Sequence, residues 1–133
     1  DNDQFPPVLI HNSAKAYNLV KDELASADRE TLVSIMLDAQ LYLIGIEVVA
    51  VGNINACGAT NSEIFKSALL ANSSCIILCH NHPSGNLEPS PDDIAFTKNL
   101  IMCGNILGIK IYDHIVVSSR GFTSMYERGL LNP

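Results

Sequence analysis

The sequence predicts an α/β domain of the α+β type, in which a mixed β-sheet is flanked by helices. Runs of β-branched and aliphatic residues alternate with segments of helical spacing along the chain. Two strand-like runs follow one another directly, which breaks the strand–helix rhythm of a doubly wound parallel sheet. The hydrophobic fraction of 47% and the charged fraction of 17% are typical of a compact domain with a large core. We therefore expect one domain over residues 1–133, with residues 1–30 as an N-terminal extension containing a strand or helix.

The expected elements follow one another in the order helix, strand, strand, helix, strand, helix, strand, strand. Their expected bounds are Ser13–Leu24, Thr31–Leu37, Tyr42–Val51, Asn61 or Ser62 to Leu70, Ser74–Cys79, Pro91–Leu107, Ile109–Val117 and Gly121–Met125.

In the first half of the chain, the spacing of apolar residues distinguishes helix from strand. The first helix has apolar residues three and four positions apart, and Ser13 is a plausible N-cap. The next two runs are rich in β-branched residues, and the segment Asp38–Leu41 between them indicates a hairpin. Helical spacing then returns in the segment that ends at Leu70, where Ser62 is a weak N-cap.

In the second half, the third strand is short and continuously apolar, as expected of a strand that is buried on both faces. The helix after it has a clear start, with Ser90 as N-cap, Pro91 at the first helical position and two acids in the first turn. Gly104 and Gly108 indicate the C-terminal end of this helix. Two further apolar runs give the last strands.

The charge pattern and the cysteines limit the function classes. The net charge is −6 and the 8 basic residues are scattered, whereas binding to a phosphate backbone uses clustered Lys and Arg. Direct nucleic-acid binding by this domain is therefore not expected. No run approaches the roughly 18 apolar residues of a membrane span. The 4 cysteines have no CxxC spacing and fit buried positions in a reducing compartment, so we expect a cytoplasmic protein.

The segment His80–Asp93, which reads HNHPSGNLEPSPDD, predicts a metal site. Alternate residues of a strand point to the same side, so His80 and His82 project together from the end of the third strand and Asn81 points away. Two imidazoles on one face can bind zinc. The Pro-Ser-Gly turn that follows allows a later residue to return toward the histidines.

An acid at the start of the next helix is the candidate for a third ligand. Helical periodicity does not choose between Asp92 and Asp93. A Ser-x-x-Asp sequence is also a capping box, which needs no metal. Three protein ligands that leave a position for water are typical of catalytic rather than structural zinc.

A catalytic zinc site needs a general base, and Glu47 is the candidate. It is the only charged residue in Leu41–Val51, where both strand faces are apolar. An ionised carboxylate in such surroundings is costly unless it has a partner or a chemical role. The alternative is an edge strand on which Glu47 faces water.

These residues together resemble the motif of the JAB/MPN (JAMM) metalloprotease superfamily, which reads Glu, then H-x-H-P, then P-S-x-x-D. The matching positions are Glu47, His80–Pro83 and Pro89–Asp93. The HNHPSG wording and the DHI at Asp113–Ile115 are similar to the RadC-like branch of that superfamily. The resemblance covers roughly Thr31 to Leu130.

The resemblance implies a JAB/MPN-like fold, a curved mixed sheet in a three-layer arrangement like that of cytidine deaminases. It implies Zn²⁺ as the cofactor, held by His80, His82 and Asp93, and so selects one of the two adjacent acids. It also implies Glu47 as general acid/base and Ser90 as a group that stabilises the oxyanion.

By this resemblance the chain is expected to be a zinc metallopeptidase that cleaves peptide or isopeptide bonds, so that its partner is a peptide or protein substrate. The alternative is a non-enzymatic module, associated with DNA repair or mobile elements, that acts through partners. The resemblance leaves Asp113 and His114 with two interpretations. They either support the zinc ligands from behind or form a purely structural contact.

Overall fold

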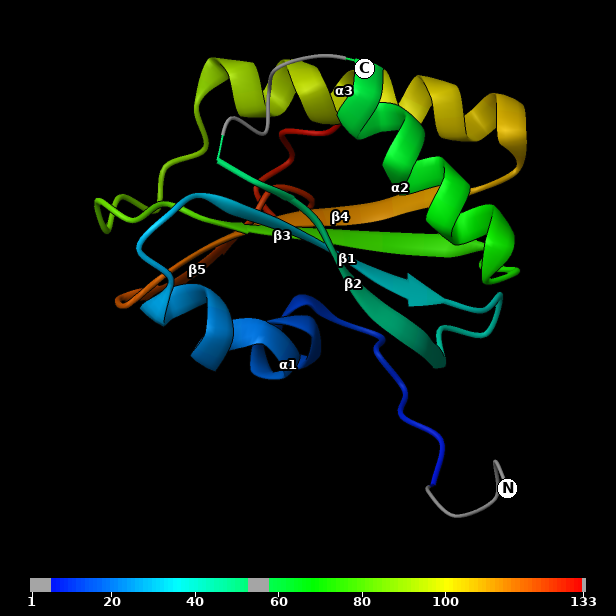
Figure 1. Cartoon of the computed structure of the whole chain (residues 1–133), viewed down its shortest axis with the longest axis horizontal. Coiled ribbons are helices and arrows are strands. Elements are labelled where there is room, and N and C mark those ends of the chain that lie inside the picture. The colour runs from blue at the N-terminus through cyan, green and yellow to red at the C-terminus, as the bar shows by residue number, and fades with distance from the viewer. Residues whose placement is uncertain (1–5, 53–57, 133) are drawn as a thin grey trace.

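Five strands form one mixed sheet between two layers of helices in the computed structural model, which describes residues 6–52 and 58–132 (Figure 1). The elements are α1 (Ser13–Ser26), β1 (Thr31–Leu37), β2 (Leu43–Val51), α2 (Gly58–Leu70), β3 (Cys75–Asn81), α3 (Pro91–Leu107), β4 (Lys110–Ser118) and β5 (Gly121–Ser124). The predicted fold class is confirmed.

The strands lie in the order β2-β1-β3-β4-β5, so β2 and β5 are the edges of the sheet. The pair β3 and β4 is parallel and the other pairs are antiparallel. Because α3 crosses between the two parallel strands, its first turn lies beside the carboxyl end of β3. Every residue of β3 is buried, as the continuous apolar run predicts.

Successive residues of each strand serve two separate cores, because their side chains point to opposite faces. α1 covers one face of the sheet, and α2 and α3 cover the other (Figure 1). The core under α1 includes Val20, Leu24, Ile35, Ile77 and Cys79. The core under α2 and α3 includes Leu32, Ile64, Ile76, Leu78 and Leu100. Each fully buried aliphatic side chain contributes roughly 1.5–3 kcal/mol.

The start of α1 differs from the prediction. The N-cap is Asn12, whose side-chain oxygen accepts a hydrogen bond from the backbone N–H of Lys15 at 2.8 Å. Ser13 is the first helical residue, so the prediction of Ser13 as N-cap is wrong. Asn and Ser are about equally good N-caps, and spacing alone does not distinguish two adjacent candidates.

The other two helices show how capping residues affect the accuracy of a predicted start. α2 begins at Gly58 and includes Ser62, so Ser62 is not its cap. α3 has the predicted bounds, with Ser90 as N-cap and Gly108 in the left-handed conformation at its end. The start of α3 is predicted well because several capping signals coincide there.

Cys75 and Cys79 are buried and free, as expected of small core residues, and Cys57 lies outside the described residues. Burial raises the pKa of the Cys75 thiol to about 11. The helices in the described ranges include none that is long and apolar enough to cross a lipid bilayer.

Gly104 lies within α3 rather than at its end, and it leaves room for the chain to return closely past the helix just before β4. A Cβ atom at this position would lie 2.2 Å from the backbone oxygen of Ile109. We expect Gly104→Ala to lower the free energy of unfolding by about 1–3 kcal/mol, because the overlap outweighs the better helix propensity of Ala. Urea unfolding measures the change. The exposed neighbour Asn105→Ala is the control, and equal stability of the two variants would contradict this account of the packing.

Candidate metal centre

His80 and His82 meet at the carboxyl end of β3. The strand continues through His80 to Asn81, two residues further than predicted. The Nε2 atoms of the two histidines are 3.0 Å apart, so the two rings share one side as the strand period requires. The side chain of Asn81 points away, accepts a hydrogen bond from Thr31 N at 2.6 Å and donates one to Arg29 O at 3.0 Å.

The turn after His82 returns the chain to the histidines. Gly85 has φ 89°, a left-handed conformation that suits glycine, and its N–H donates to the His82 carbonyl at 2.9 Å. α3 then begins, and its third residue, Asp93, is buried with its carboxylate against both rings. Asp93 Oδ2 lies 3.2 Å from His82 Nε2, and Oδ1 lies 3.5 Å from His80 Nε2. Asp92 is exposed.

The spacing of these atoms fits a metal ligand set. With metal–nitrogen distances of about 2.0–2.1 Å, ligand atoms around a tetrahedral zinc lie roughly 3.3 Å apart. The observed separations between His80, His82 and Asp93 are 3.0, 3.2 and 3.5 Å. His82 Nδ1 is 2.8 Å from the carbonyl oxygen of Asn86, which can only accept, so this nitrogen carries the proton of the neutral ring. Nε2 of His82 is then free to bind a metal.

The electrostatics of the cluster favour a cation. Burial opposes ionisation of Asp93, but the hydrogen bonds that His80 and His82 donate in their protonated forms outweigh it and hold the pKa of this carboxyl well below its usual range. The hydrogen bond with Asp93 raises the pKa of His82 against the effect of burial, and the charge of Glu30 acts in the same direction. A negative charge therefore persists beside the two rings at neutral pH.

Ser90 and Asp93 also form the capping box that the sequence allowed. Ser90 Oγ accepts a hydrogen bond from Asp93 N at 3.0 Å, and Asp93 Oδ2 accepts one from Ser90 N at 2.9 Å. The capping box and the contact with the histidines coexist, because the Asp93 carboxylate reaches both. The capping box fixes the carboxylate in place. A role of Ser90 toward an oxyanion stays a prediction.

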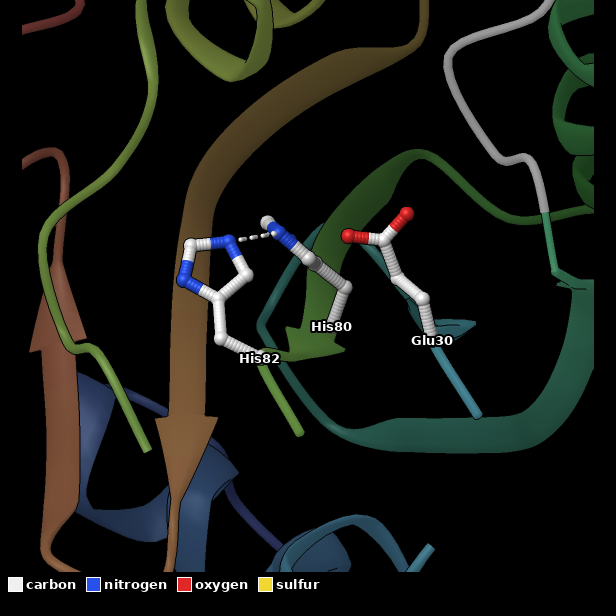
Figure 2. Close-up of side chains that lie close together, drawn as sticks. All are labelled: Glu30, His80 and His82. Carbon is white, nitrogen blue, oxygen red and sulfur yellow. Dashed lines mark hydrogen bonds between the residues drawn. The ribbon is translucent and has the colours of Figure 1, made fainter. Parts of the chain in front are cut away.

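Glu30 is a second carboxylate at the cluster, and sequence reasoning missed it. One of its oxygens and a ring nitrogen each from His80 and His82 lie within 4.8 Å of one another. Figure 2 shows the carboxylate turned toward His80 from the segment before β1, whereas both histidines come from the end of β3. The pairing register of β1 with β3 could have indicated the position of Glu30. Leu32 pairs with His80, so continuing the antiparallel register by two residues puts Glu30 opposite His82.

The backbone around Glu30 is held from two sides. The carbonyl of Glu30 accepts a hydrogen bond from Gly52 N at 2.7 Å, at the end of β2. On either side of Glu30 in the chain, Arg29 O and Thr31 N bind the amide of Asn81. Asn81 therefore positions the Glu30 segment from the opposite face of the sheet.

Glu47 lies on an edge strand of the sheet. It is exposed on edge strand β2 and pairs with Ser34, which in turn pairs with Leu78 of β3. Neighbouring strands are about 4.8 Å apart, so β2 and β3 are separated by roughly 10 Å. Among the described residues, the group of possible ligands around the two histidines includes Glu30. β2 is an edge strand and Glu47 is exposed, as the alternative expects, and its role as general acid/base stays a prediction.

Asp113 and His114 point to opposite faces of β4 and have different surroundings. His114 Nε2 lies 2.7 Å from His80 Nδ1, behind the candidate ligand. Asp113 accepts hydrogen bonds from Ser124 Oγ at 2.6 Å and from Tyr126 N at 3.0 Å. His114 therefore contacts the candidate ligand His80, and Asp113 holds the turn after β5.

Comparison with known proteins finds a family and relatives that match most of this chain. The family described as "RadC-like JAB domain" matches residues 10–130. A UPF0758 protein of Moorella thermoacetica is 39% identical over 123 residues, which cover 92% of this chain and 54% of the relative. A UPF0758 protein of Clostridium beijerinckii is 40% identical over 114 residues, 86% of this chain and 50% of the relative.

An archaeal relative extends the comparison. The UPF0758 protein of Methanococcoides burtonii is 36% identical over 127 residues, 96% of this chain and 56% of its own length. The chain thus spans about half the length of the curated relatives it matches. From the family match over almost all of its length and from its mixed sheet between helices, the chain belongs to the RadC-like JAB domains, a branch of the JAB/MPN superfamily.

Proposed function

We propose that this chain is a zinc metallopeptidase of the JAMM type, which hydrolyses peptide or isopeptide bonds of a protein or peptide substrate. The observation that carries the proposal is the convergence of His80, His82 and Asp93 at separations of 3.0–3.5 Å, with the Glu30 carboxylate beside them. Two imidazoles with one carboxylate are a ligand set typical of catalytic zinc.

The distances assign different roles to the two carboxylates. Asp93 lies at ligand spacing from both rings, at 3.2 and 3.5 Å, and the capping box keeps it there. Glu30 belongs to a looser group whose atoms lie within 4.8 Å of one another. Asp93 is therefore assigned as the third metal ligand and Glu30 as the general base. A bound zinc would lower the pKa of water toward about 7 and polarise the scissile carbonyl.

Glu30 supplies the proton transfer that amide hydrolysis needs. Its half-buried carboxylate accepts a proton from the attacking water and delivers it to the leaving nitrogen. Hydrogen bonds between residues 29–31 and both Asn81 and Gly52 hold the backbone from which this side chain extends. A general base must be held within hydrogen-bond reach of the water, and these hydrogen bonds serve that requirement.

The decisive experiment combines metal analysis with an unbiased cleavage screen. The protein is purified without chelators, its metal content is determined, and libraries of peptides and isopeptide-linked peptides are incubated with it. We expect zinc at one ion per chain and cleavage that stops when a chelator removes the metal. Zinc at full occupancy without cleavage of either library would instead favour the non-enzymatic module.

Ser90 has two proposed roles, which one substitution separates. Its Oγ caps α3 by accepting from Asp93 N, and its hydroxyl hydrogen is proposed to bind the oxyanion. We expect Ser90→Ala to lose about 1 kcal/mol of stability through the cap, and about 10²-fold in turnover through the oxyanion. Ser90→Thr keeps the hydroxyl and is the control. Turnover that stays at the wild-type value in a destabilised Ser90→Ala would limit Ser90 to the cap.

A further inference from the structure

Three buried side chains, those of Thr97, His114 and His80 itself, form a chain of close contacts. Thr97 of α3 places its Oγ1 2.8 Å from the backbone oxygen of Asp93 and 2.6 Å from Nδ1 of His114. The other nitrogen of His114, Nε2, lies 2.7 Å from Nδ1 of His80. All three side chains have a relative exposure of 0%, so water does not compete for these hydrogen bonds.

The position of each proton follows from the one group that cannot donate. The Asp93 carbonyl has no hydrogen, so the contact at 2.8 Å requires the single hydroxyl hydrogen of Thr97. The contact between Thr97 and His114 at 2.6 Å then takes its hydrogen from Nδ1 of His114. Nε2 of a neutral His114 is left as an acceptor.

The proton of His80, the candidate ligand, can be placed in the same way. Since Nε2 of His114 accepts, the contact at 2.7 Å takes its hydrogen from Nδ1 of His80. A neutral His80 then has no hydrogen on Nε2, the atom that faces Asp93 and His82.

We propose that Thr97 and His114 are positioning residues that hold His80 in the tautomer with a bare Nε2, so that the ring is ready to bind the metal. This inference rests on the proposed metal site. It adds a function for the first turns of α3. They supply Asp93 as a ligand and, one helical turn later, Thr97, whose hydroxyl determines which nitrogen of each imidazole carries the proton. The tautomer of His82 is set separately, by the Asn86 carbonyl.

Protonation of the other nitrogen on each of the two imidazoles would oppose metal binding. If Nε2 of His114 carried the hydrogen, Nδ1 of His80 would accept it, and Nε2 of His80 would carry a proton pointing at the metal position. That proton must leave before a metal binds. Thr97→Val removes the hydroxyl with little change in shape and so removes the group that excludes protonation of the other nitrogens. Thr97→Ser retains the hydroxyl.

The experiment measures the tautomer and the metal affinity on the same proteins. In the metal-free, ¹⁵N-labelled wild-type protein, long-range ¹H–¹⁵N spectra of the imidazoles should show His80 protonated at Nδ1 and bare at Nε2. Competition with a chromogenic chelator should give a Zn²⁺ affinity about 10–100-fold weaker for Thr97→Val, because loss of an outer partner of a ligating histidine has effects of this size. Thr97→Ser should resemble wild type in both measurements.

The outcomes separate this inference from the proposed function. A proton on Nε2 of His80 in the metal-free wild-type protein, or wild-type zinc affinity in a folded Thr97→Val, overturns the inference while the metal site stands. Failure of the wild-type protein to bind zinc overturns the metal site itself. If Thr97→Val does not fold, the wild-type spectrum together with Thr97→Ser still decides the tautomer.

Discussion

Glu30→Gln is expected to lower the rate of amide hydrolysis by about 10²–10⁴ while zinc remains bound, because it removes the proton acceptor and keeps the shape of the side chain. Glu30 lies beside both histidines, yet Asp93 holds the position at ligand spacing. Zinc content and turnover should be measured on one preparation, with a substrate taken from the cleavage screen.

Glu47→Gln is the matched control, because it makes the same chemical change on exposed strand β2. Its turnover and zinc content should equal those of the wild-type protein. A large loss of turnover in Glu47→Gln together with an active Glu30→Gln would restore Glu47 as the base. If Glu30→Gln lost its zinc as completely as a histidine variant does, Glu30 would be a ligand, and the assignment of the two carboxylates would be wrong.

His82→Ala is expected to abolish stoichiometric zinc binding. Its Nε2 is the atom of the cluster nearest to both other candidate ligands, 3.0 Å from His80 and 3.2 Å from Asp93. Two remaining protein ligands hold zinc poorly, and binding that is coupled to the folded state is lost with them. The measurement is elemental analysis after reconstitution with zinc and removal of the excess.

A thermal readout adds an independent test of His82→Ala. Zinc at a thousand times its Kd stabilises the folded state by about 4 kcal/mol, so a chelator should lower the Tm of the wild-type protein and leave that of His82→Ala unchanged. His11→Ala, at an exposed histidine, is the control and should bind zinc as the wild-type protein does. One zinc per chain in His82→Ala would exclude this histidine from the metal centre.

The bounds of β1 and α3 could be predicted from sequence because their signals are local. β1 is an unbroken β-rich run, and α3 begins where a Ser N-cap, a Pro and two acids coincide. The common side of His80 and His82 was predictable for the same reason, since the period of two is a property of one strand. The start of α2 lacked such a signal, and its prediction was late.

The position of Glu47 shows what local reasoning leaves open. An isolated carboxylate in an apolar strand suggests a chemical role only if that strand is interior, and β2 is an edge. Strand order depends on pairing between distant segments, which residue spacing does not reveal. Glu30 gave no signal in the chain, because a glutamate in a polar segment before a strand resembles a solvated charge.

By itself, the sequence determined the elements, the mixed sheet, the two histidines of one strand and the acidic start of the helix after it. Only the tertiary structure decided that Glu30 lies beside His80 and His82, and that Thr97 and His114 lie behind His80. The physical reason is that a residue's own backbone fixes the direction of its side chain. The group that it meets is set by long-range pairing of strands and packing of helices.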